Sequence, residues 1–158
     1  MNEIKSKGKA PAFSLKDKEG VRHSLKDFDS EFIVLYFYPK DNTPGCTIEA
    51  NMFSKDSAKY SALNTTVVGV SGGDEKTKSK FCERNRLKIL LLSDTDFSVA
   101  TKYGVYGEKS FMGRKYMGVS RVTFILDNSR KIVKVFDKVK PAIHSKEVLE
   151  FLKLNGGK

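Results

Sequence analysis

The chain contains few of the residues that disulfide-rich, metal-binding and membrane-spanning proteins need. Its 158 residues include two cysteines, two histidines, four prolines and no tryptophan. Two cysteines do not make a disulfide framework, and neither residue type shows the short CxxC or HxxxH spacing of zinc sites. The longest apolar run, residues 32–38, is far too short to cross a bilayer. We therefore expect a globular protein with no metal, no cofactor and no membrane partner.

The first residues, Met1-Asn2-Glu3-Ile4-Lys5, also lack the apolar segment of a signal peptide. A cytoplasmic location is the expectation that follows. Positive charge, in contrast, is in excess, because the formal net charge is +10. The lysines are scattered along the chain instead of forming one basic tract, and no RNP, KH or C2H2 motif is present. We expect a solvated basic surface and no nucleic-acid partner.

Hydrophobic periodicity predicts an α/β domain. The order of the expected elements indicates a single domain over residues 1–158, with a central mixed β-sheet flanked by helices and an N-terminal β-hairpin within residues 13–25. We expect Asp74 and Ser145 to cap the helices that follow them, and residues 104–119 to form a long loop. The expected strands are 32–38, 67–71, 89–92, 121–126 and 131–135, and the expected helices are 44–62, 75–86, 96–103 and 146–155.

Cys46 lies where a buried strand passes into a helix. Strand 32–38 is followed by Pro39, a turn, and the helix that starts near residue 44. In the first turn of that helix, a thiol is close to backbone N–H groups without helical partners and to the positive end of the helix dipole, both of which stabilise a thiolate. This placement indicates a reactive cysteine.

The helix end is too weak to generate the thiolate alone. A thiol in water has a pKa near 8.5, so only about 3% is ionised at pH 7. Ionising about 90% requires a pKa of about 6, which corresponds to about 3.4 kcal/mol. A helix N-terminus typically supplies about 0.3–1 kcal/mol and at most about 2 kcal/mol. A fixed cation is therefore needed as well, and sequence spacing alone does not identify it.

Residues 39–46, Pro-Lys-Asp-Asn-Thr-Pro-Gly-Cys, resemble the PxxxTxxC signature of peroxiredoxins. The wider run 37–50 resembles the bacterioferritin-comigratory-protein branch, also called PrxQ, and the similarity continues through 92–94, 104–109 and 121–127. The resemblance implies a thioredoxin-like fold. It also implies a thiol-dependent peroxidase that reduces hydrogen peroxide and organic hydroperoxides and is recycled by thioredoxin or a similar dithiol.

The resemblance assigns roles to five residues around the signature. Cys46 matches the peroxidatic cysteine, and Arg121 matches the arginine that would supply the missing cation. Thr43 matches the threonine whose hydroxyl orients the peroxide, although it is also a plausible turn residue. Pro39 matches a proline that shields the thiolate from water, although it also ends a strand. Glu49 matches a glutamate that orients the polar network, with a role as helix-dipole partner as the alternative.

One position departs from the pattern of many branch members. They carry a second cysteine five residues after the first, where this chain has Asn51. Cys82, in the expected helix 75–86, matches the resolving cysteine of other members and would form an intramolecular disulfide with Cys46. Alternatives are a buried filler or a one-cysteine enzyme reduced by an external thiol. Because the thiols lie on different helices, we expect local opening before they bond.

The sequence is also compatible with a second function on the same fold. Residues 43–46, Thr-Pro-Gly-Cys, look like a CxxC loop whose first cysteine is replaced by Thr43. A thioredoxin-like thiol–disulfide oxidoreductase or a redox sensor is therefore the alternative to a peroxidase. The missing vicinal dithiol disfavours it. An intramolecular disulfide needs no second subunit, and we expect a monomer.

Overall fold

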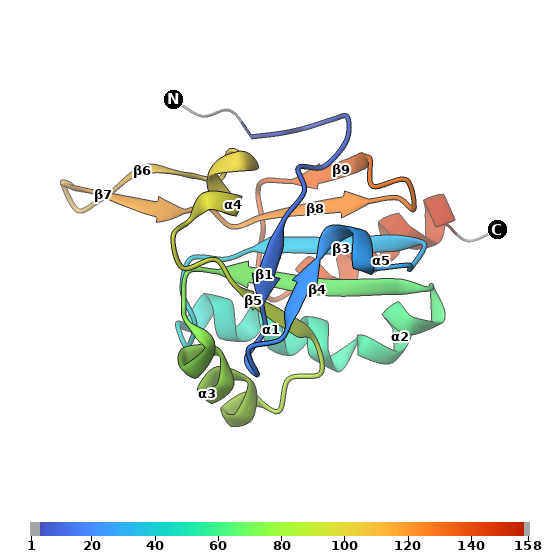
Figure 1. Cartoon of the computed structure of the whole chain (residues 1–158), viewed down its shortest axis with the longest axis horizontal. Coiled ribbons are helices and arrows are strands. Elements are labelled where there is room, and N and C mark those ends of the chain that lie inside the picture. The colour runs from blue at the N-terminus through green and yellow to red at the C-terminus, as the bar shows by residue number, and fades with distance from the viewer. Residues whose placement is uncertain (1–3, 157–158) are drawn as a thin grey trace.

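The computed structural model describes residues 4–156, so Met1 to Glu3 of the N-terminal segment considered above lie outside it. Seven strands form the central sheet in the order β2-β1-β5-β4-β3-β8-β9 (Figure 1). Strands β3, β4 and β5 run parallel, whereas the other pairings are antiparallel, which confirms the expected mixed sheet. The bounds are β1 Ser14–Lys16, β2 Arg22–Ser24, β3 Phe32–Phe37, β4 Thr65–Ser71, β5 Leu90–Ser93, β8 Val122–Leu126 and β9 Ile132–Phe136.

Apolar side chains pack against both faces of the sheet. Successive side chains of a strand point to opposite faces, so a strand that is buried throughout contributes to both. All residues of β3 are buried. Ile33, Leu35 and Phe37 pack in a core with α4, and Val34 and Tyr36 pack in a second core with α1, α2, α3 and α5. The helices are α1 Pro44–Lys55, α2 Ser57–Ala62, α3 Glu75–Asn85, α4 Ser98–Lys102 and α5 His144–Gly156. Within the described residues, no helix combines the length and apolar character needed to span a bilayer.

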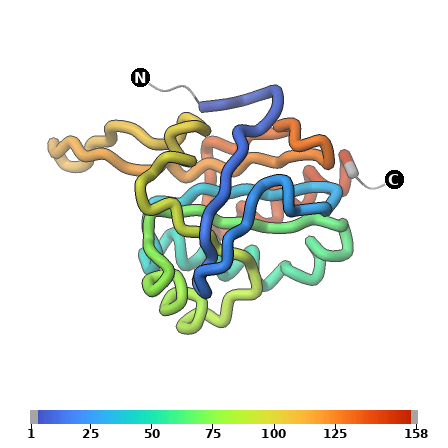
Figure 2. Tube along the Cα trace, viewed as in Figure 1, coloured from blue at the N-terminus to red at the C-terminus, as the bar shows by residue number. Residues whose placement is uncertain are grey.

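The expected loop 104–119 is wrong, because this segment forms a two-stranded hairpin. Strands β6 Tyr106–Phe111 and β7 Arg114–Val119 pair with each other and project from the rest of the domain (Figures 1 and 2). Met112 and Gly113 make the tight turn with φ of 51° and 80°, the combination that a two-residue hairpin needs. Most of the hairpin is exposed, so its sequence lacks the apolar alternation that marks a half-buried strand.

Two helix predictions also need correction. The single expected helix 44–62 is broken at Asp56 into α1 and α2. Ser145 lies inside α5 and does not cap it, since the helix begins at His144. The two places are in contact, because the Ser145 hydroxyl donates to Asp56 Oδ2 at 2.8 Å and lies 2.9 Å from the Tyr60 hydroxyl. The predicted cap at Asp74 is confirmed, because its carboxylate accepts from the Thr77 N–H at 2.8 Å.

Candidate active site

Cys46 is the third residue of α1 and only 1% exposed. Thr43 is the N-cap residue in extended conformation and Pro44 starts the helix, a position where proline's missing N–H costs no helical bond. The chain reaches α1 directly from β3, through a turn in which Asn42 has a φ of 63°. The predicted strand-to-helix placement of the thiol is confirmed, and it lies against the core at the positive end of the helix.

Arg121 is the cation at this thiol. Its Nη1 donates to Cys46 Sγ at 3.3 Å and to Glu49 Oε1 at 2.8 Å. The sheet brings it there, because Val122 pairs with Phe37 and so places Arg121 just beyond the end of β3. The charges of Cys46 and Glu49 outweigh the opposing effect of burial and raise the pKa of Arg121, so the guanidinium stays charged.

Gly45 leaves room for that guanidinium. A β-carbon at this position would lie 3.0 Å from Arg121 Nη2 and 3.8 Å from Pro141 Cγ. That first distance is tighter than ordinary van der Waals contact, so a side chain would require the guanidinium to shift by a few tenths of an ångström. The absence of a side chain on the residue before Cys46 is therefore part of how the site is built.

Glu49 lies one turn further along α1 and is 1% exposed. Burial raises its pKa to about 7, although the hydrogen bond and charge of Arg121 act in the opposite direction. One carboxylate oxygen faces Arg121, and the other, Oε2, has no hydrogen-bond partner among the described residues. A buried carboxyl with a pKa of about 7 can gain or lose a proton at physiological pH. Glu49 also shares Arg121 with the Cys46 thiol.

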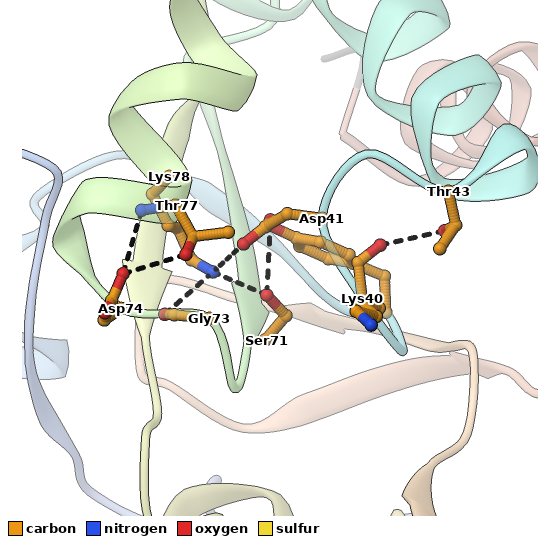
Figure 3. A network of polar contacts seen from close by, with 9 residues as sticks. Lys40, Asp41, Thr43, Ser71, Gly73, Asp74, Thr77 and Lys78 are labelled. Carbon is orange, nitrogen blue, oxygen red and sulfur yellow. Dashed lines mark hydrogen bonds and ion pairs between the residues drawn. The ribbon is translucent and has the colours of Figure 1, made fainter.

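Thr43 and Pro39 belong to the turn that joins β3 to α1. The Thr43 hydroxyl donates to the Lys40 carbonyl at 2.8 Å (Figure 3). Its proton is then in use, and its lone pairs remain available to accept from a bound O–H group. Pro39 is exposed and follows the end of β3, as a strand-ending residue does. Its shielding of the thiolate stays a prediction.

Cys82 lies in the last turn of α3, and burial raises its pKa, with Lys18 opposing. The structure places it in the same apolar cluster as Cys46, on one face of the sheet, and both are free thiols. Asn51 donates to Asn85 at 3.3 Å, so α1 and α3 are neighbours here. Phe81, the neighbouring residue, is fully buried, and Cys82 is slightly more exposed at 5%.

The expectation that the lysines form a solvated surface is wrong for Lys78. It is completely buried on α3 and forms an ion pair with Asp41 at 3.0 Å. Its helical spacing from Phe81 and Cys82 was a usable signal, because residues three and four apart share a helix face. The sequence does not identify the ion-pair partner of Lys78, because Asp41 is 37 residues away along the chain. Among the described residues, no cluster of His, Cys, Asp and Glu could hold a metal ion.

Comparison with known proteins places this geometry in a family. Residues 7–135 match the AhpC/TSA family. The chain is 40% identical over 153 residues to "Peroxiredoxin Bcp" of Escherichia coli (strain K12), covering 97% of this chain and 98% of that protein. It is 39% identical over 145 residues to "Peroxiredoxin Bcp" of Bacillus subtilis (strain 168), covering 92% of each.

Among solved structures, a Xylella fastidiosa PrxQ mutant superimposes with a TM-score of 0.90 at 30% identity, over 98% of both chains. A Xanthomonas campestris bacterioferritin comigratory protein, whose alkyl peroxide reduction activity has been described, superimposes with a TM-score of 0.85 at 30% identity, over 91% of this chain and 92% of that one.

Proposed function

The chain belongs to the AhpC/TSA family and is a thiol peroxidase of the thioredoxin-like fold, and from this premise we propose that Cys46 is the sulfur that reduces the hydroperoxide. The observation that carries the assignment is the 3.3 Å contact between Arg121 Nη1 and Cys46 Sγ at the first turn of α1. This contact supplies a fixed cation, which is needed because the helix end alone stabilises a thiolate too weakly. Burial raises the pKa of Cys82, and among the described residues no cation donates a hydrogen bond to its sulfur.

In the first step, the Cys46 thiolate attacks one oxygen of the hydroperoxide. An S–O bond forms and the O–O bond breaks, and the leaving oxygen takes the electron pair and a proton to become water or an alcohol. Arg121 and the N–H groups at the start of α1 stabilise the negative charge on that oxygen, because they are already in place when the charge develops. The Thr43 hydroxyl accepts from the peroxide O–H and orients it. The product is a Cys46 sulfenic acid.

In the second step, the Cys82 thiolate attacks the sulfenic sulfur. The S–S bond forms, the S–O bond breaks, and hydroxide leaves with a proton as water. A disulfide requires Cα atoms within roughly 7 Å and aligned side chains. Because Cys46 is held by Arg121 in α1 and Cys82 is packed in the last turn of α3, part of α1 or α3 opens first.

A dithiol protein such as thioredoxin then reduces the disulfide and closes the cycle. We place the protein in the cytoplasm, since two free thiols fit a reducing compartment. An intramolecular disulfide needs no second subunit, so a monomer suffices. The activity described for the Xanthomonas campestris protein makes organic hydroperoxides, together with hydrogen peroxide, the proposed substrates.

Two serine variants test the assignment. Cys46→Ser should fold normally and consume no hydroperoxide above background. Cys82→Ser should still consume one equivalent in a single turnover, because the first step needs only Cys46, but should lose sustained turnover with thioredoxin. Substantial consumption by Cys46→Ser would remove Cys46 from its role. Sustained turnover by Cys82→Ser would show that an external thiol resolves the sulfenic acid.

The alternative function is tested with the same variants. A thiol–disulfide oxidoreductase of the CxxC type uses a second cysteine close to its nucleophile, and Thr43 occupies that position. The wild-type protein should therefore reduce a protein disulfide such as that of insulin no faster than Cys46→Ser. Rapid reduction that depends on Cys46 would favour the oxidoreductase.

A further inference from the structure

A buried ion pair joins the loop before α1 to helix α3. Lys78 Nζ lies 3.0 Å from Asp41 Oδ2, and both side chains are 0% exposed. The same ammonium group donates to the Ser71 hydroxyl and to the Gly73 carbonyl (Figure 3). Its three N–H groups therefore have three acceptors. A lysine is almost never fully buried without such partners.

The carboxylate of Asp41 is equally well satisfied. Its Oδ1 accepts from the Tyr38 hydroxyl at 2.5 Å and from the Ser71 hydroxyl at 3.4 Å. Gly73 packs directly onto the other oxygen, since a β-carbon on this residue would overlap Asp41 Oδ2. The network fits together only when the loop, the end of β4 and the start of α3 are all in place.

The network connects the two segments that carry the thiols. Asp41 lies five residues before Cys46, and Lys78 lies four residues before Cys82, one turn away on α3. Among the described residues, no hydrogen bond joins the network to either sulfur. Asp41 and Lys78 therefore take no direct part in the reaction with peroxide. Their effect is on whether the two segments stay together.

We propose that the Asp41–Lys78 pair is an interlock between the Cys46 loop and α3, which sets the balance between the closed form that reacts with peroxide and the open form that makes the disulfide. This proposal rests on the proposed Cys46–Cys82 disulfide. Lys78 and Asp41 are then positioning residues for the second step. They determine how long the Cys46 sulfenic acid persists, and hence how often a second hydroperoxide oxidises it to the sulfinic acid before Cys82 attacks.

The direction of the effect follows from the charges. Removing one partner leaves a buried, unpaired charge in the closed form, and that charge is hydrated only when α3 or the loop opens. Lys78→Met should therefore favour opening. Replacing both partners with uncharged side chains of similar size removes the unpaired charge, and a buried pair replaced in this way is often no less stable. The double variant Asp41→Asn/Lys78→Met should therefore close again.

The test separates the two chemical steps by rapid acid quench and intact mass. After one equivalent of hydrogen peroxide, Lys78→Met should convert sulfenic acid to disulfide about tenfold faster than wild type, because the open form is more populated. The double variant should return to within about threefold of the wild-type rate, or below it. In all variants, oxidation of Cys46 should change by less than about threefold. With excess peroxide, Lys78→Met should accumulate less sulfinic acid.

Lys80→Met is the matched control, because Lys80 lies on the same helix and is exposed. It should leave both steps unchanged. Ser71→Ala is the gentler variant if Lys78→Met folds poorly, since it removes only the shared hydroxyl, and it should speed disulfide formation in the same direction by about threefold. Amide hydrogen exchange in α3 of the reduced protein should rise in Lys78→Met and Ser71→Ala and stay unchanged in Lys80→Met.

A pH profile separates the interlock from a direct effect of the Lys78 charge on Cys82. The interlock predicts faster disulfide formation in Lys78→Met with an unchanged pH profile. A charge effect predicts slower formation and a profile displaced to higher pH in Lys78→Met, because the Lys78 charge lowers the pKa of Cys82, and this outcome overturns the interlock. Equal disulfide rates in folded Lys78→Met and wild type overturn it too, as does a double variant as fast as the single one. A wild-type protein that forms no disulfide refutes the role of Cys82 as well.

Discussion

The two thiols of this enzyme each lie near a cation–carboxylate pair, and the pairs differ in their burial and in what they contact. Arg121 and Glu49 lie 2.8 Å apart beside Cys46, and the Arg121 side chain is 21% exposed. Lys78 and Asp41 lie 3.0 Å apart one turn before Cys82, and neither side chain is exposed. Arg121 donates to a sulfur, whereas every donor of Lys78 is used within the network.

A cation–carboxylate pair therefore has two different roles in this protein: one pair acts on a reacting sulfur, and the other holds segments of the chain together. The fork of a guanidinium can bind Glu49 and still offer a donor to the Cys46 thiolate. The ammonium of Lys78 is surrounded by acceptors from three segments and is used up in holding them together. We therefore expect variants at Arg121 to affect the reaction rate with a smaller effect on stability, and variants at Lys78 to affect stability with a smaller effect on the reaction with peroxide.

The largest effect expected is the loss of stability in Lys78→Met. Removing one partner of a buried ion pair typically costs about 3–5 kcal/mol, because the remaining charge is buried and unpaired. Urea denaturation should show a loss of this size, and Asp41→Asn/Lys78→Met should recover most of it. Lys80→Met should stay within about 0.5 kcal/mol of wild type. A single variant as stable as this control would contradict the description of Lys78 as an essential partner of Asp41.

The next effect is catalytic. Arg121→Ala should slow oxidation of Cys46 by about 10²–10³-fold, the range measured for removal of one donor to a developing oxyanion. Stability should fall less than in Lys78→Met, because the freed Glu49 can be protonated near neutral pH, where its pKa of about 7 already lies. Arg121→Lys should rescue the rate only in part, since it restores the charge without the fork. A rate for Arg121→Ala within about threefold of wild type would remove Arg121 from the site.

A third prediction concerns pH. The pKa of Glu49 is raised from its ordinary value of 4.5 to about 7 by burial. The folded state therefore binds more protons than the unfolded state between these values, and the contribution of Glu49 to the unfolding free energy falls as pH rises through that window. Glu49→Gln should remove this dependence.

The measurement is the difference in unfolding free energy between Glu49→Gln and wild type across the window from 4.5 to about 7. Comparison of the two proteins is needed because His144 acts in the opposite direction. Burial lowers the pKa of His144 from 6.5 to about 4, so its contribution rises with pH. Parallel stability curves for the two proteins would show that Glu49 does not titrate in this window.

The smallest effect is expected for Gly45→Ala. Alanine favours a helix over glycine by about 0.5–1 kcal/mol, so the unfolding free energy should be unchanged or slightly higher. The added methyl group meets Arg121 Nη2 at 3.0 Å and requires it to shift by a few tenths of an ångström. Oxidation of Cys46 should therefore slow by about threefold to tenfold, measured by rapid quench. An unchanged rate would show that the guanidinium position is not critical.

Much of the fold was predictable, because buried strands carry a strong local signal. The strand 32–38 corresponds to β3, and the placement of Cys46 at the start of the next helix is confirmed. The hairpin of β6 and β7 was missed because its side chains are mostly exposed and give no apolar period. The break at Asp56 was missed because no proline or glycine marks it in the sequence, and the contact of Asp56 with Ser145 joins residues 89 positions apart.

The site was predictable only where the residues are close in sequence. Pro39 to Cys46 form one local unit, and the thiol and its helix could be inferred from their order. Arg121 is 75 residues from Cys46 and came from the family resemblance, since no local pattern links a cation to a thiol across a sheet. The Asp41–Lys78 pair has the same long-range character and no resemblance to reveal it.

In the proposed cycle, Cys46 reacts with the peroxide, and Cys82 then forms a disulfide with Cys46. Intact mass of the reduced protein before and after one equivalent of hydrogen peroxide, followed by peptide mapping, tests both parts at once. We expect the loss of two hydrogen atoms and a peptide pair joined through Cys46 and Cys82. A protein that gains one oxygen atom at Cys46 and keeps a free Cys82 would contradict it.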